Sequence, residues 1–209
     1  MIPFLRLLSL GAALTTLAYA QSGSIELFNG KDLTGWSFVN AKSEPLAKVA
    51  TVLPNGVLAV TGKPTGYLMV EGVHSNYRLH AEYRWLKPKG NSGFFVHISS
   101  GPVGGKAWPM CLQVQNHDQH TGELIPMGGF TFEGGPPDGK IYDLRQAPKE
   151  NPIGEWNTCD VTCQGDEVIA VVNGVEQNHA THCSKSSGQI GLQLEGYPFE
   201  IRVLRLTPM

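Results

Sequence analysis

Polar and apolar residues alternate along residues 77–86, in the middle of the chain. His80, Glu82 and Arg84 fall on one side of an extended backbone there, and apolar side chains fall on the other. A period of two is typical of a β-strand with one solvated face. We therefore predict a strand that ends in the turn at residues 87–91.

Two further segments continue this pattern. Residues 92–99 place His97 opposite apolar neighbours, and residues 111–116 place Gln113 and Gln115 opposite Leu and Val. If these strands pair, their polar side chains gather on one sheet surface. If that surface is concave, it would form a binding groove for a polar ligand with little or no charge.

Residues 189–195 alternate in the same way near the end of the chain, with Gln193 and Glu195 opposite apolar side chains. Matching alternation in four strands predicts that their polar members share one face. A one-residue bulge would move the polar members of its strand to the core face. The side chains expected on the shared surface are Arg84, His97, Gln113, Gln115 and Glu195.

The remaining signals favour an all-β fold. Asn-Gly pairs at Asn55 and Asn173 each lie between two short apolar segments, which is typical of a β-hairpin. We find no long helical period, and the chain contains 25 glycines and 14 prolines. We predict one domain over residues 21–209, a sandwich or jelly roll of two antiparallel sheets.

Two regions lack a clear periodic pattern. Residues 100–107 form a glycine-rich loop, and residues 120–150 form the longest irregular region of the chain. A loop of that length in a compact domain is usually functional or mobile.

Residues 1–20 have the features of a secretory signal peptide. Arg6 precedes the apolar run at residues 7–17, and Ala18 and Ala20 form a small-x-small cleavage site. The run is too short to anchor the chain in a bilayer. We expect a secreted or periplasmic protein, cleaved near Ala20 and with no membrane anchor in the mature chain.

Charge and cysteine content narrow the classes of partner. The net charge of −2 and the scattered basic residues do not indicate nucleic-acid binding.

Cys159 and Cys163 lie on the same face of one predicted strand, too far apart to form a disulfide with each other. Either could pair with Cys183, since export permits disulfides. Alternatively these three and Cys111 are small buried hydrophobic side chains.

Several segments, taken in order, resemble one family. They are LFNGKDLTGW (27–36), GNSGFFVH (90–97), GEWN (154–157), VNG (172–174) and GQIGLQLEG (188–196). This series is similar to that of the 3-keto-disaccharide hydrolases and covers nearly all of the mature chain. The resemblance implies a concanavalin A-like jelly roll of two antiparallel sheets. It also implies an exported enzyme that cleaves glycosides already oxidised to a ketone at C3.

One position departs from the family pattern. The family usually carries Glu-x-Gln on the strand after the glycine-rich loop, often with Asp three residues later. The corresponding residues here are Gln113, Gln115 and Asp118. An amide cannot act as a base. The departure leaves two hypotheses open, an enzyme with another base and a noncatalytic carbohydrate-binding module on the same fold.

The expected chemistry needs a base near neutral pKa and donors for an enolate oxygen. His97 is the first candidate base, because imidazole titrates near neutral pH; a hydrogen-bonded sheet histidine is the alternative. Glu195 could replace the missing Glu, or it could pair with Arg84. His117, Asp118 and His120 form a polar cluster that could supply a base or bind a divalent metal. A solvated loop end is the alternative for that cluster.

Other residues are candidates for substrate binding. Arg84 could donate to sugar hydroxyls, and Gln113, Gln115 and Gln193 could hold hydroxyls from the polar face. Trp108 suits the C–H face of a sugar, although a core tryptophan fits equally well. Tyr142, in the long loop, could cover a ligand.

Overall fold

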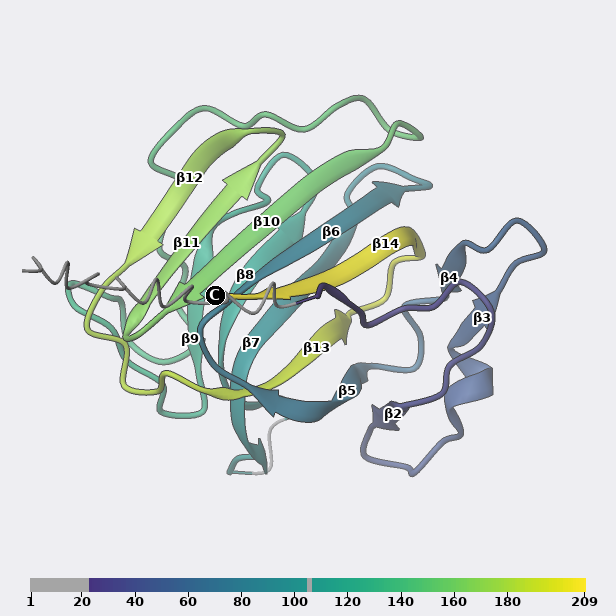
Figure 1. The fold of residues 1–209 in the computed structure, drawn as a ribbon, viewed down its shortest axis with the longest axis horizontal. Helices are drawn as coiled ribbons and strands as arrows, with labels where there is room; N and C mark the ends of the chain where they lie inside the picture. The colour runs from purple at the N-terminus through teal and green to yellow at the C-terminus, as the bar shows by residue number, and fades with distance from the viewer. Residues whose placement is uncertain (1–22, 105–106) are drawn as a thin grey trace, which may run out of the picture.

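The computed structural model describes residues 23–104 and 107–209, so the expected signal peptide lies outside the described residues. The described residues form two antiparallel sheets and contain one short 3₁₀ turn, Leu46–Lys48, with no α-helix (Figure 1). None of them belongs to a helix long and apolar enough to span a membrane. The expected two-sheet β-sandwich is confirmed.

The larger sheet has eight strands in the order β12-β11-β10-β6-β14-β4-β3, with β1 beside β14. Its centre pairs strands that are distant in sequence, because β6 lies between β10 and β14. The strands are β1 Ile25–Glu26, β3 Ala50–Val52, β4 Leu58–Val60, β6 Tyr77–Trp85, β10 Asn157–Gln164, β11 Glu167–Val172, β12 Val175–Ala180 and β14 Phe199–Pro208.

The smaller sheet has six strands in the order β2-β5-β13-β7-β8-β9. Here β7 separates β13 from β8, so residues of those two strands face each other across it. The strands are β2 Trp36–Val39, β5 Gly66–His74, β7 Asn91–Pro102, β8 Pro109–His117, β9 Leu124–Met127 and β13 Gly188–Leu194.

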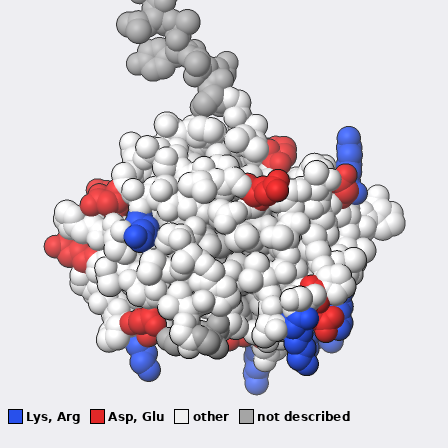
Figure 2. All heavy atoms as spheres, turned by 90° about the horizontal axis from the view of Figure 1, so that it is seen from below, with Lys and Arg blue, Asp and Glu red and all other residues white. Residues whose placement is uncertain are grey.

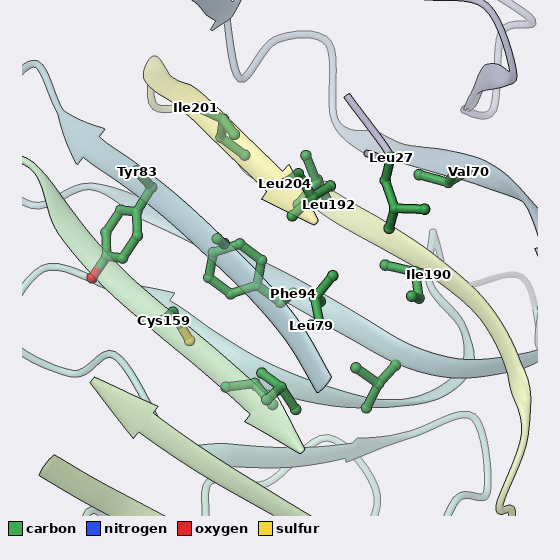
Figure 3. Packing of buried hydrophobic residues seen from close by; sticks show 14 of the residues in the cluster. Leu27, Val70, Leu79, Tyr83, Phe94, Cys159, Ile190, Leu192, Ile201 and Leu204 are labelled. Carbon is green, nitrogen blue, oxygen red and sulfur yellow. The ribbon is translucent and has the colours of Figure 1, made fainter. Parts of the chain in front are cut away.

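The main hydrophobic core lies between the two sheets. Alternate residues of β6 face inward, so Leu79 and Tyr83 are fully buried (Figure 3). Tyr83 meets Phe94 of the opposite sheet with ring centroids 5.9 Å apart. Each large apolar side chain buried in this way contributes about 1.5–3 kcal/mol relative to exposure. Because this core covers the inner face of the six-stranded sheet, only the outer face of that sheet is open to a ligand.

Several local predictions are confirmed. The segments around Asn55 and Asn173 form the hairpins β3–β4 and β11–β12. Asn173 and Gly174 have φ of 46° and 79°, the left-handed backbone that a tight hairpin turn requires. All four cysteines are buried free thiols, in agreement with the interpretation as small core side chains.

The region expected to be irregular, residues 120–150, includes a buried strand. Residues Leu124–Met127 pair with β8 as the edge strand β9, and Leu124 also bridges to Tyr142. The run of four buried residues has no polar alternation, which is why the pattern did not reveal it. Two residues of β9, Ile125 and Met127, line a cavity on the outer face of this sheet.

Charged side chains are scattered over the surface. Figure 2 shows acidic and basic groups side by side in several places, with uncharged surface over much of the rest of that face. The distribution agrees with the low net charge of the chain, −2 at pH 7.

Candidate active site

A cavity of about 270 Å³ opens on the outer face of the six-stranded sheet, the face turned away from the main core. Its floor comes from β8, β9 and β13, and the loop after β9 forms one wall. We call this cavity the polar pocket. Its lining residues are Trp108, Gln113, Gln115, Ile125, Met127, Gly128, Asp138, Gly139, Ile141, Gln193 and Glu195.

Three glutamines form the centre of the polar pocket, and we call them the amide trio: Gln113, Gln115 and Gln193. The Nε2 atom of Gln113 donates to Oε1 of Gln115 and, at 3.2 Å, to Oε1 of Gln193. All three side chains are buried. Because the oxygens of Gln115 and Gln193 are both engaged, their amide nitrogens are the groups left to donate to a ligand.

A glycine in the intervening strand permits this contact. Gly93 of β7 lies opposite Gln115, between the strands that carry Gln113 and Gln193. A Cβ atom built on Gly93 would lie 2.7 Å from Cδ of Gln113, which is closer than packed carbons tolerate. The absence of a side chain at Gly93 therefore leaves the space in which the amides meet.

Glu195 supplies a carboxylate beside the amide trio. It directly follows β13, and its Oε2 atom accepts a hydrogen bond of 3.0 Å from Nδ2 of Asn91. Burial raises the pKa of Glu195 above the ordinary carboxyl value, and the bond from Asn91 opposes part of that rise. A raised pKa makes this carboxylate a stronger base than an exposed glutamate.

Apolar groups complete the polar pocket. Trp108 packs edge-on against Phe95, with ring centroids 6.1 Å apart, and its remaining surface lines the cavity. Ile141 also lines the cavity and stays 50% exposed. A second carboxylate, Asp138, accepts a hydrogen bond of 3.0 Å from the backbone N–H of Gly129. The pocket thus combines amide donors and carboxylates with apolar walls, a combination that suits a sugar.

Residues 23–207 match the sequence pattern of the 3-keto-alpha-glucoside-1,2-lyase-like domain. The chain belongs to this family. No curated protein has a sequence that matches it significantly.

Solved structures agree with the jelly-roll fold of this 3-keto-alpha-glucoside-1,2-lyase-like chain. A protein provisionally assigned as a glycosyl hydrolase from Parabacteroides distasonis has a TM-score of 0.68 at 20% identity, covering 90% of this chain and 94% of that one. The carbohydrate-binding module CBM66 from Bacillus subtilis has a TM-score of 0.56 at 12% identity, covering 82% and 95%. The β-glucanase of Bacillus licheniformis has a TM-score of 0.54 at 15% identity, covering 90% and 99%. At these identities the likeness establishes the fold alone.

The structure places five of the expected site residues of this family member together. Gln113, Gln115, Gln193, Glu195 and Trp108 all line the polar pocket, as the alternation of their strands and the position of the tryptophan suggested. Six lining residues were missed: Ile125, Met127, Gly128, Asp138, Gly139 and Ile141. The Gly-Gly and Asp-Gly pairs of the long loop were visible in the sequence, but nothing local showed which strand the loop would cover.

His97 does not share this surface, which corrects our first candidate for the base. Between the pairs Gln189–Ile98 and Gly191–Phe95, β7 has one residue more than β13. This bulge gives His97 a φ of 56° and reverses the alternation after Val96. The imidazole points into the core, packs edge-on against Tyr77 at 6.1 Å and is fully buried. Burial also lowers its pKa.

Arg84 lies on the other sheet, so the expectation that it shares a surface with Glu195 is wrong. It projects from β6 on the outer face of the eight-stranded sheet and forms an ion pair of 2.6 Å with Glu200 of β14. Its guanidinium also lies 4.6 Å from the ring of Trp156. The expected cross-strand ion pair exists, but its acidic partner is Glu200.

The cluster at the end of β8 does not form a metal-ligand set. Oδ2 of Asp118 accepts the backbone N–H of Lys89 at 3.0 Å, and the rings of His117 and His120 stack with centroids 5.0 Å apart. Nδ1 of His120 lies 2.7 Å from Oε1 of Glu123. Over residues 23–104 and 107–209, no group of three or more His, Cys, Asp or Glu side chains is arranged to hold a metal ion.

His117 and Tyr142 also lie apart from the lining of the polar pocket. Burial lowers the pKa of His117, and the neighbouring His120 lowers it further. Tyr142 packs edge-on against Phe132, with ring centroids 5.4 Å apart, on the side of the main core. The adjacent Ile141 occupies the position over the pocket that we had expected for Tyr142.

Proposed function

We propose that the polar pocket binds a glycoside carrying a ketone at C3 and cleaves it by elimination, with Glu195 as the general base. The observation that carries the proposal is a carboxylate of raised pKa beside two amide nitrogens that are left to donate. Membership of the 3-keto-alpha-glucoside-1,2-lyase-like family supports the substrate class.

The elimination requires a base because the ketone acidifies the proton on C2. Glu195 removes that proton, the C2–H electrons delocalise onto the C3 oxygen, and an enolate forms. The enolate then expels the C1 substituent, a C1–C2 double bond remains, and the proton passes from Glu195 to the departing alcohol. Addition of water to C1, with a proton to C2, completes net hydrolysis.

The amide trio has a distinct part in this scheme. The nitrogens of Gln115 and Gln193 donate hydrogen bonds to the C3 oxygen as its negative charge develops. Trp108 and Ile141 contact the apolar C–H faces of the ring. Gln113 does not take a proton; it holds the other two amides in orientation.

A direct test uses purified protein with methyl 3-keto-glucoside, with and without EDTA. We expect turnover in the parent, and a loss of about 10²–10⁴-fold in Glu195→Gln. The matched control is Glu155→Gln, since Glu155 is exposed and lies outside the pocket. Equal turnover in parent and Glu195→Gln would exclude Glu195 as the base. Loss of parent activity with EDTA would show that a metal contributes.

A noncatalytic carbohydrate-binding module is the second candidate, because Gln113 replaces the Glu usual at that position in the family. In that case the parent binds neutral sugars in the polar pocket and shows no turnover. Calorimetric titration with methyl glucoside, run beside the activity assay, distinguishes the two functions.

We also propose that the chain works outside the cytoplasm, from the signal-peptide features of residues 1–20. Mass spectrometry of the exported protein should find Gln21 as the first residue. A mature protein that retains Met1 would contradict this proposal.

A further inference from the structure

A second cavity, of about 500 Å³, opens on the outer face of the six-stranded sheet, over β2, β5 and the end of β7. We call it the apolar pocket. Serine hydroxyls and the side chain of Gln189 complete its lining, and no described Asp, Glu, Lys or Arg contributes to it. Its apolar wall consists of Val39, Tyr67, Met69, Val73, Ile98 and Pro102.

The two pockets share one floor. A single hydrophobic cluster, separate from the main core, contains Ile125 and Met127 of the polar pocket together with Tyr67 and Ile98 of the apolar pocket. Phe95 joins them, since its ring lies 5.7 Å from that of Tyr67 and 6.1 Å from that of Trp108. Both pockets therefore open over one buried apolar layer on the same face of the sheet, and Trp108, which lines the polar pocket, packs on Phe95 of that layer.

The lining of the apolar pocket selects the chemistry of its occupant. The polar pocket holds two carboxylates and three amides, whereas the apolar pocket holds no ionised group. Nε2 of Gln189 already donates to the carbonyl of Val70. Val73 is 72% exposed and presents an isopropyl group to water. An apolar ligand would cover this side chain, and the removal of its apolar surface from water would favour binding.

We propose that the apolar pocket holds an uncharged, apolar leaving group of the glycoside whose sugar ring occupies the polar pocket. This inference rests on the proposed function, which supplies a C1 substituent to be placed. On this proposal the apolar pocket determines which leaving group the enzyme prefers. Val73 then affects substrate specificity without taking part in the chemical step.

The test compares methyl and hexyl 3-keto-glucosides, because the two alcohols leave about equally well and differ in apolar length. We expect the parent to give a kcat/KM at least about 10-fold higher for the hexyl substrate. Val73→Asp and Ser187→Asp each place a charge at the apolar pocket, and should remove this preference while leaving the methyl substrate unaffected. Leu86→Asp is the control, since Leu86 is 42% exposed and lines neither pocket.

Each outcome decides the proposal. Equal kcat/KM for the two substrates in the parent would overturn it, and so would a Val73→Asp effect of the same size on both. If neither substrate is turned over, the proposed function fails, and calorimetry with unoxidised methyl and hexyl glucoside then tests the apolar pocket. Tighter binding of the hexyl glucoside, lost in Val73→Asp and Ser187→Asp, supports the apolar pocket without the enzyme; equal binding overturns it.

Discussion

Gln113 on β8 reaches Gln193 on β13 across the whole width of β7, with 3.2 Å between Nε2 and Oε1. The two strands are not neighbours, so ordinary cross-strand contacts do not join them. The link exists because β7 carries glycine at position 93. It sets the direction of the amide trio.

Gly93→Ala should break this link. The added methyl group would lie 2.7 Å from Cγ and Cδ of Gln113, and Gln113 must move out of the space between the strands. We expect a stability loss of about 1–3 kcal/mol, typical of overpacking, and a larger relative fall in kcat than in substrate affinity. Urea unfolding and kinetics with methyl 3-keto-glucoside measure the two effects. Gly23→Ala is the matched control, because a Cβ there has nothing within 4 Å and Gly23 lines neither pocket; equal effects of the two variants would contradict the role of Gly93.

Gln113→Glu restores the carboxylate usual in the family. Its oxygens would accept hydrogen bonds from Gln115 and Gln193 after those amides rotate. If the chain is a weakened enzyme, turnover of methyl 3-keto-glucoside should rise above that of the parent. Gln164→Glu, at an exposed position of β10, controls for added charge. A folded Gln113→Glu that is no faster than the parent would show that Gln113 is not what limits catalysis.

The pH dependence of turnover should follow Glu195. The base acts when deprotonated, and burial raises its pKa above the ordinary value of 4.5. Activity should therefore rise with pH along an acid limb above that value. Asn91→Ala removes the hydrogen bond that lowers the pKa of Glu195, so the limb should move to higher pH. The measurement is kcat/KM against pH for both proteins. If the acid limb of Asn91→Ala lies at the same pH as that of the parent, a group other than Glu195 produces it.

Stability should fall in acid because of His97. Burial lowers the pKa of its imidazole in the folded state, whereas in the unfolded chain the imidazole has its ordinary pKa of 6.5. As pH falls below about 6.5, the unfolded state takes up a proton first, and the free energy of unfolding decreases until pH passes the folded pKa. Urea midpoints at pH 7.5 and 5.5 should therefore differ in the parent, and differ less in His97→Leu. His179→Leu, on β12, is the comparison variant, because it removes a histidine paired with Glu167 rather than one buried in the core; a change in the pH dependence equal to that of His97→Leu would contradict the role of His97.

The same variant separates the structural role of His97 from a catalytic one. Because its ring lies in the core, folded His97→Leu should keep kcat within about 10-fold of the parent, less than general-base loss usually costs. A fall in kcat of about 10²–10⁴-fold in a folded His97→Leu protein would instead indicate that His97 is the general base.

The sequence alone determined the fold class, since short alternating segments and Asn-Gly turns are local signals. It also determined the common face of Gln113, Gln115, Gln193 and Glu195, because a period of two carries side-chain direction along any regular strand. Only the tertiary structure decided the rest. The bulge that turns His97 into the core depends on the partner strand β13, and the separation of Arg84 from the polar pocket depends on which sheet β6 joins. A two-residue turn specifies the pairing of the two strands it joins. The pairing of strands that are distant in sequence depends on how the whole core packs, and no local signal specifies it.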